Sequence, residues 1–136
     1  MSNPTGMDFM IHYHDGGYTH EPKEYYGLKI TSVEFTEKSL NIGFENGKTI
    51  KLWDYGQTCC ENRYMTTDDD VKSLIGHRLT RIDPNNVKVK KSEWGDEHEA
   101  TFIEIGTNQN FITIVTHNEH NGYYGGFCLA IDEVSP

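Results

Sequence analysis

The chain has 136 residues and a formal net charge of −9, with 35% hydrophobic and 12% aromatic residues. This length suits a single domain with one buried core, and the aromatic content argues against a disordered chain. The negative charge argues against sequence-independent binding to nucleic acid, which depends on Lys and Arg side chains that neutralise phosphates. An acidic surface suits a basic protein partner, and simple solubility is the alternative interpretation.

The sequence carries no sign of a membrane or of export. No run approaches the ~20 apolar residues that a membrane helix needs, and the start "MSNPTGMDFM" lacks the basic and apolar parts of a secretion signal. Three cysteines in such a chain favour reduced thiols. We therefore expect a cytoplasmic protein.

The first part of the chain predicts an arm followed by strands. Residues 1–20 predict a flexible or docked arm, with a short hairpin turning at Gly16-Gly17 as the alternative, and residues 21–136 predict a single domain. In "LKITSVEF" two large apolar residues fall on one parity and two on the other. One strand presents both pairs to a single core only with a bulge near Thr31-Ser32.

The segment "SLNIGFENGKTIKL" predicts a hairpin, and its side chains decide the loop length. A two-residue loop at Asn46-Gly47 would place the apolar residues of the two strands on opposite faces. A three-residue loop, with Gly47 in the left-handed conformation, places them all on one face. The predicted pairs are Phe44 with Lys48, Ile42 with Ile50 and Leu40 with Leu52.

"TTDDDVKSLIG" predicts a short helix. Thr67 is the expected N-cap, the acids Asp68, Asp69 and Asp70 lie where the helix dipole favours anions, and Gly76 ends the helix. Val71, Leu74 and Ile75 fall on one face, so we expect this helix to lie on a sheet. The three acids also belong to the acidic surface that we expect to bind a partner.

The rest of the chain predicts further strands. "NNVKVKK" is typical of a half-exposed edge strand, and "SEWGDEHEA" of a charged loop. "ATFIEIGTNQNFITIVT" predicts a second hairpin, whose latter strand is expected to be central and covered on both sides. "GGFCLAID" predicts a last strand. Together these elements predict an α+β fold, a mainly antiparallel sheet with one short α-helix packed on it.

The cysteines in "YGQTCCENRY" allow several interpretations, of which a disulfide between the neighbours is least favoured because it demands an unusual local geometry. A zinc site would use Cys59 with His117 and His120, two histidines at a chelating separation in a loop, although adjacent cysteines point in opposite directions. A nucleophilic site would use Cys60 activated by His117 or His120. Packing is the remaining interpretation, and we favour it because free cysteines are among the most buried residues.

The loop "HNEHNGYYGG" is the other notable stretch. Tyr123 and Tyr124 point to opposite sides if the segment is extended, so that one packs inward and one is presented to a partner. A strand-entry bulge with a structural tyrosine is the alternative. The residues expected to bind a partner are therefore Tyr123, Tyr124, Glu119, Asp68, Asp69 and Asp70.

Three motifs in order, "CCE", "DDVKSLIG" and "NGYY", resemble an uncharacterised family of small domains from phages, prophages and bacteria. The resemblance covers roughly Thr49 to Asp132. It implies a small cytoplasmic α+β protein of mobile-element origin and no established activity. The histidine-rich N-terminal segment and "HNEHNGYYGG" depart from the family pattern.

These observations favour a binding protein over an enzyme. We expect a small acidic module, phage- or prophage-borne, that inhibits a host defence system as an anti-CRISPR protein does. Its partner would be a basic, nucleic-acid-handling host protein, with no direct contact to nucleic acid or membrane and no cofactor. The alternative is a metal-dependent or Cys/His hydrolase of a small molecule or nucleotide, using Cys60, His117 and His120. A structural accessory of a virion is a third hypothesis.

Overall fold

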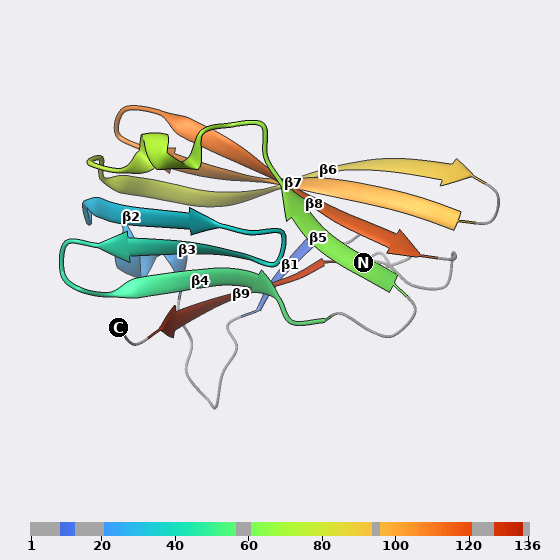
Figure 1. The fold of residues 1–136 in the computed structure, drawn as a ribbon, viewed down its shortest axis with the longest axis horizontal. Helices are drawn as coiled ribbons and strands as arrows, with labels where there is room; N and C mark the ends of the chain where they lie inside the picture. Colours follow the sequence, from blue (N-terminus) through green and yellow to red (C-terminus); the bar gives the residue numbers. More distant parts are fainter. Residues whose placement is uncertain (1–8, 13–20, 57–60, 94–95, 121–126, 135–136) are drawn as a thin grey trace.

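The computed structural model describes residues 9–12, 21–56, 61–93, 96–120 and 127–134. They form two sheets and two single turns of 3-10 helix (Figure 1). The first sheet has the strand order β1-β9-β4-β3-β2 and the second the order β5-β8-β7-β6. The elements are β1 (Phe9–His12), η1 (Pro22–Tyr25), β2 (Ile30–Phe35), β3 (Ser39–Phe44), β4 (Thr49–Asp54), β5 (Glu61–Thr66), η2 (Val71–Leu74), β6 (Leu79–Glu93), β7 (Asp96–Thr107), β8 (Phe111–His120) and β9 (Phe127–Val134).

The α+β prediction is wrong, because no α-helix occurs among the described residues. The expected helix is the single turn η2. Its N-cap is Asp70 and not Thr67 as predicted, and the Asp70 side chain accepts a hydrogen bond from Lys72 N at 3.0 Å. Gly76 follows the turn with a φ of +92°. Of the three apolar residues expected to face the sheet, only Leu74 is fully buried. Apolar residues three positions apart lie on one side of a 3-10 turn as well as of an α-helix, so the spacing does not distinguish the two. Four residues are too few to form a stable α-helix.

The β3–β4 hairpin confirms the three-residue loop. Ile42 pairs with Ile50 and Leu40 with Leu52. Phe44 N donates to Lys48 O at 2.8 Å, and Gly47 has a φ of +86°. The predicted bulge is also present, as the β2–β3 register shifts between Ile30 and Ser32. Both features bring the buried residues Ile30, Val33, Ile42, Ile50 and Leu52 to one face.

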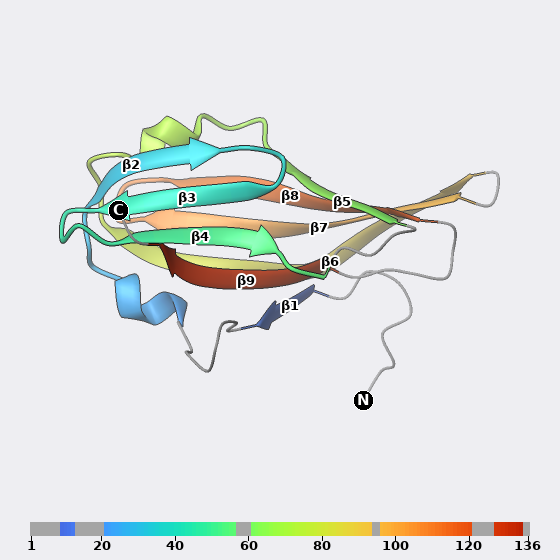
Figure 2. The same ribbon diagram turned by 60° about the horizontal axis from the view of Figure 1, so that its bottom comes forward.

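The two sheets pack as layers around one apolar core (Figure 2). At one edge they are joined, because Gly27 N donates to Leu79 O and Ile30 N to His77 O, both at 2.8 Å. At the other end the β6–β7 hairpin and the ends of β5 and β8 extend past the first sheet (Figures 1 and 2). The core residues that are fully buried include Ile30, Ile42, Ile50, Leu52, Ile105, Ile114 and Ile131.

Three further predictions meet the structure with mixed results. β6 lies at an edge of the second sheet, as its Val–Lys alternation predicts. "SEWGDEHEA", expected as a loop, belongs largely to β6 and β7, which pair up to Glu93 and Asp96. β8 is central but not covered on both sides, since Phe111 is 57% exposed.

The N-terminal segment contributes one strand. β1 pairs in parallel with β9, from Phe9 opposite Phe127 to His12 opposite Ala130. The alternative hairpin at Gly16-Gly17 lies outside the described residues. None of the helical turns in the described part of the chain is long or apolar enough to cross a bilayer.

Candidate functional site

The inner face of the second sheet changes from aliphatic to polar along its strands. On β7 the inward residues run from Ile105 and Ile103 to Thr101 and Glu99, and on β8 from Ile114 to polar residues. The change occurs at the buried pair Thr101–Thr116, whose hydroxyl oxygens are 2.6 Å apart. Beyond it, the buried polar residues of the three neighbouring strands are Glu61, Arg63, Glu99, Asn118 and His120.

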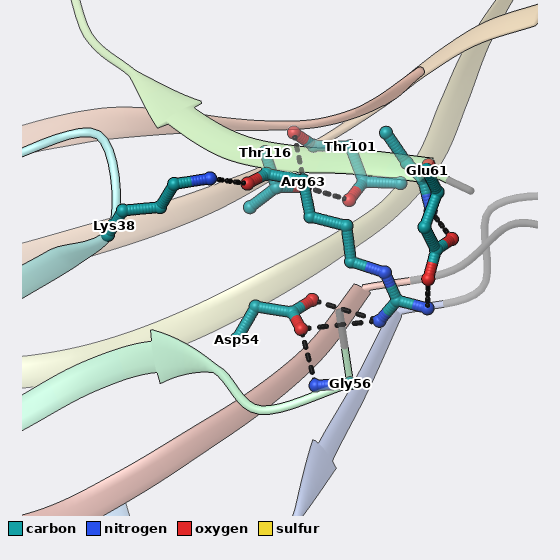
Figure 3. Close-up of polar contacts among 8 residues, drawn as sticks. Lys38, Asp54, Gly56, Glu61, Arg63, Thr101 and Thr116 are labelled. Carbon is teal, nitrogen blue, oxygen red and sulfur yellow. Dashed lines mark hydrogen bonds and ion pairs between the residues drawn. The ribbon is translucent and has the colours of Figure 1, made fainter. Parts of the chain in front are cut away.

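Arg63 is the centre of this polar region (Figure 3). Its guanidinium donates to Asp54 at 3.0 Å through Nη1 and to Glu61 at 2.8 Å through Nη2, and the three side chains are only 7%, 8% and 0% exposed. Asp54 also accepts a bond from Gly56 N at 2.6 Å. Asp54 ends β4 and Arg63 lies on β5, so the pair ties the two sheets together.

The network continues across the second sheet. Asn118 Nδ2 donates to Glu61 at 2.9 Å, and His120 Nε2 lies 2.9 Å from Glu99 Oε1. Both Glu99 and Asn118 are 0% exposed. Burying charged groups is costly unless they are paired. Such a concentration of charge is therefore expected where it fixes a unique packing or holds a ligand.

A hollow of about 220 Å³ opens beside Arg63 and Asp54. Lys38, Lys51, Trp53 and Tyr64 also line it. Lys38 Nζ donates to the carbonyl oxygen of Arg63 at 2.7 Å, and Lys51 Nζ lies 4.7 Å above the Trp53 ring. The buried charges thus have an approach from the surface between the two sheets.

The outer face of the same sheet carries a cluster of rings. The rings of Tyr64 and His117 stack with centroids 4.6 Å apart, and His98 Nε2 lies 2.9 Å from His117 Nδ1. Burial, reinforced by His98, holds the pKa of His117 below its ordinary value. Burial and a hydrogen bond to Glu119 raise the pKa of Tyr64 to about 12.

The structure separates the two histidines that the sequence analysis joined. His117 and His120 lie within β8 rather than in a loop, and residues three apart on a strand point to opposite faces. His117 therefore faces outward beside Tyr64, whereas His120 faces inward beside Glu99. A zinc or catalytic set that contains both imidazoles is wrong for this reason. Cys59, Cys60, Tyr123 and Tyr124 lie outside the described residues.

The predicted acidic residues have local roles. Asp70 caps η2, and Asp69 Oδ2 accepts a hydrogen bond from Thr113 N at 2.8 Å, which fixes the turn to β8. Asp68 is exposed. Glu119 is exposed on the outer face, next to Tyr64.

The buried residues at the centre of the site, Glu61, Arg63 and Glu99, were not predicted from the sequence. No strand was predicted for "ENRYMT", and "DEHE" was predicted as part of a loop. Glu61 and Arg63 are opposite charges two residues apart and share one face of β5. That spacing of opposite charges was the available signal.

Comparison with known proteins gives a family and no activity. No curated protein and no solved structure matches this chain significantly. A family described as a domain of unknown function, DUF7448, matches residues 23–130. The expectation of an uncharacterised domain family is thereby confirmed, and the chain belongs to the DUF7448 family.

Proposed function

We propose that this chain is a small acidic protein-binding module, and that the outer face of its second sheet docks on a basic surface of another protein. The outer face is defined here by Tyr64, His98, Phe102, Phe111, Val115, His117 and Glu119. The observation that carries the proposal is the burial pattern of β8, in which every second residue is sealed inside and those between remain at least partly exposed.

The composition of the outer face supports a contact surface. Exposed aromatic residues are enriched at protein interfaces, and Phe111 is 57% exposed. The Tyr64–His117 stack and the His98–His117 hydrogen bond hold three of the rings in place. Rings that are already ordered lose little conformational entropy when a partner binds.

Charge supports a basic partner. Because the pKa of His117 is lowered, its imidazole is neutral at neutral pH and adds no positive charge to the outer face. Glu119 is exposed there, and the whole chain carries a formal charge of −9. A field of this sign accelerates association with a basic surface and weakens association with acidic ones.

In its most specific role, this module would be a mobile-element protein that inhibits a host defence system. The partner would be a nucleic-acid-handling protein of a bacterial host, since a groove that binds phosphates is strongly basic. The module would cover that groove and compete with nucleic acid. The acidic net charge of this chain supports this form.

The experiment compares variants of the outer face in a pull-down from bacterial lysate. Phe111→Ser removes an exposed ring, and Glu119→Lys reverses a charge on the outer face. Glu34 is an exposed residue of β2 in the first sheet, so Glu34→Lys changes the net charge equally and is the matched control. We expect wild type and Glu34→Lys to retain one partner that neither outer-face variant retains. Added salt or competing DNA should release this partner. Loss of that partner with Glu34→Lys alone, or no specific partner, would overturn the proposal.

A further inference from the structure

We propose that Glu97, Glu99 and His120 form a binding site for one divalent transition-metal ion, with zinc as the best match. The site lies on the inner face of the second sheet. It is independent of the outer face and of the partner proposed above.

The strand register assembles the three side chains. Glu97 on β7 lies directly opposite His120 on β8, and Glu99 follows two residues later on the same face. One ligand atom from each residue lies within 4.8 Å of the others, and Glu99 Oε1 is 2.9 Å from His120 Nε2. Two ligands on a tetrahedral zinc, each ~2.0–2.1 Å from the ion, are roughly 3.3 Å apart. Small side-chain rotations are therefore enough to coordinate an ion.

A buried oxygen points independently to a ligand. Glu99 is 0% exposed, and its Oε2 has no hydrogen-bond partner among the residues that the structure describes. Buried carboxylate oxygens are normally satisfied by donors or by a metal. A cation held by the same carboxylate would supply the missing interaction.

The charges around the site favour a cation. Asp54 and Glu61 share the guanidinium of Arg63, at 3.0 and 2.8 Å. Glu97 and Glu99 lie next to each other with the imidazole of His120. A divalent ion bound by Glu97, Glu99 and His120 would place positive charge beside two carboxylates and leave the Arg63 network as it is.

The donor set identifies the class of ion. Magnesium and calcium prefer ligand sets made of oxygen alone, whereas an imidazole together with carboxylates suits zinc and its neighbours in the first transition row. Glu97 is partly exposed, and it gives the ion a path from solvent. Water would complete a four-coordinate shell.

Calorimetric titration of tag-free protein with zinc chloride tests the proposal. We expect one zinc per chain, and at least tenfold weaker binding in His120→Ala and in Glu97→Gln. Glu97→Gln is the safer variant for folding because Glu97 is partly exposed, and circular dichroism confirms that each variant is folded. Zinc should also raise the melting temperature of wild type, and EDTA should reverse the rise.

Two controls separate this site from other zinc binding. Glu119→Gln lies one residue before His120 on the opposite face and should bind zinc as wild type does. The double variant His98→Ala/His117→Ala removes the imidazoles of the outer face and should also bind normally. Loss of binding only in this double variant would place the ion on the outer face and overturn the proposal. No binding by wild type, or tighter binding of calcium chloride than of zinc chloride, would overturn it as well.

Discussion

Replacing Arg63 by Met tests whether the buried charge network holds the two sheets together. The substitution keeps most of the side-chain volume but leaves Asp54 and Glu61, which are 8% and 0% exposed, without their guanidinium. Removing one partner of a buried ion pair costs about 3–5 kcal/mol. A domain has about 5–15 kcal/mol of stability in total, so the variant should lose roughly a fifth or more of it. With a urea slope of about 2 kcal/mol per molar, the midpoint should fall by about 2 M.

The assay is urea unfolding followed by circular dichroism. Arg78→Met is the matched control, because Arg78 pairs with Glu45 at 3.2 Å but its side chain is 56% exposed. An exposed pair of this kind contributes about 0–1 kcal/mol. The triple variant Arg63→Met/Asp54→Asn/Glu61→Gln should regain part of the loss, since no unpaired carboxylate remains. If Arg63→Met unfolds at the same urea concentration as Arg78→Met, the reasoning is refuted.

Three further predictions use pH and backbone geometry. Because the pKa of His117 is lowered in the folded state, wild type should lose stability as the pH falls below 6.5, and His117→Gln should lose less. Equal changes of unfolding free energy with pH in the two proteins, measured by urea unfolding, would contradict this. Gly47 has a φ of +86°, and a Cβ added there would meet no other atom within 4 Å. Gly47→Ala should therefore lower the free energy of unfolding by about 1–2 kcal/mol through backbone strain alone, and an unchanged urea midpoint would argue against this. Burial and the 2.9 Å hydrogen bond to Glu133 raise the pKa of Tyr25, so wild type should lose stability above pH 10. The melting temperature of Tyr25→Phe should fall less over that pH range, and an equal fall in both proteins would disprove this role of Tyr25.

The apolar half of the fold was predictable because its side chains follow the period of a strand. In the β3–β4 hairpin a single criterion, all large apolar residues on one face, selected the correct loop and register. The same criterion located the bulge in β2. Burial of apolar area dominates these choices, and apolar residues are visible in a sequence.

The buried charged residues of β5 and β7 were not predicted, because they do not follow the apolar period of a strand. β5 buries Glu61 and Arg63 and leaves Tyr64 half-exposed, so its pattern of hydrophobicity is inverted relative to an ordinary strand. The same holds for Glu99 at the start of β7. Such residues are buried because partners on neighbouring strands pair with them, and that pairing depends on contacts between residues up to 57 positions apart. Pattern analysis of a short window does not contain those contacts.

The histidines illustrate how one boundary decides a site. With β8 ending at Thr116, His117 and His120 would share a loop and could approach one ion. The strand instead continues to His120, and this extension turns the two rings to opposite sides of the sheet. The boundaries of elements are less predictable than their existence, and here the boundary determined which residues act together.

The position of β9 has a consequence for synthesis of the chain. β9 pairs with both β1 and β4, and Leu129, Ala130 and Ile131 on it are fully buried. β4 ends at residue 54 and β9 begins at 127, so 72 residues separate them. At ~5–20 residues per second, a ribosome needs roughly 4–15 s to make that stretch. Throughout that interval the edge of β4 that later pairs with β9 is open, and an open strand edge can pair with other chains.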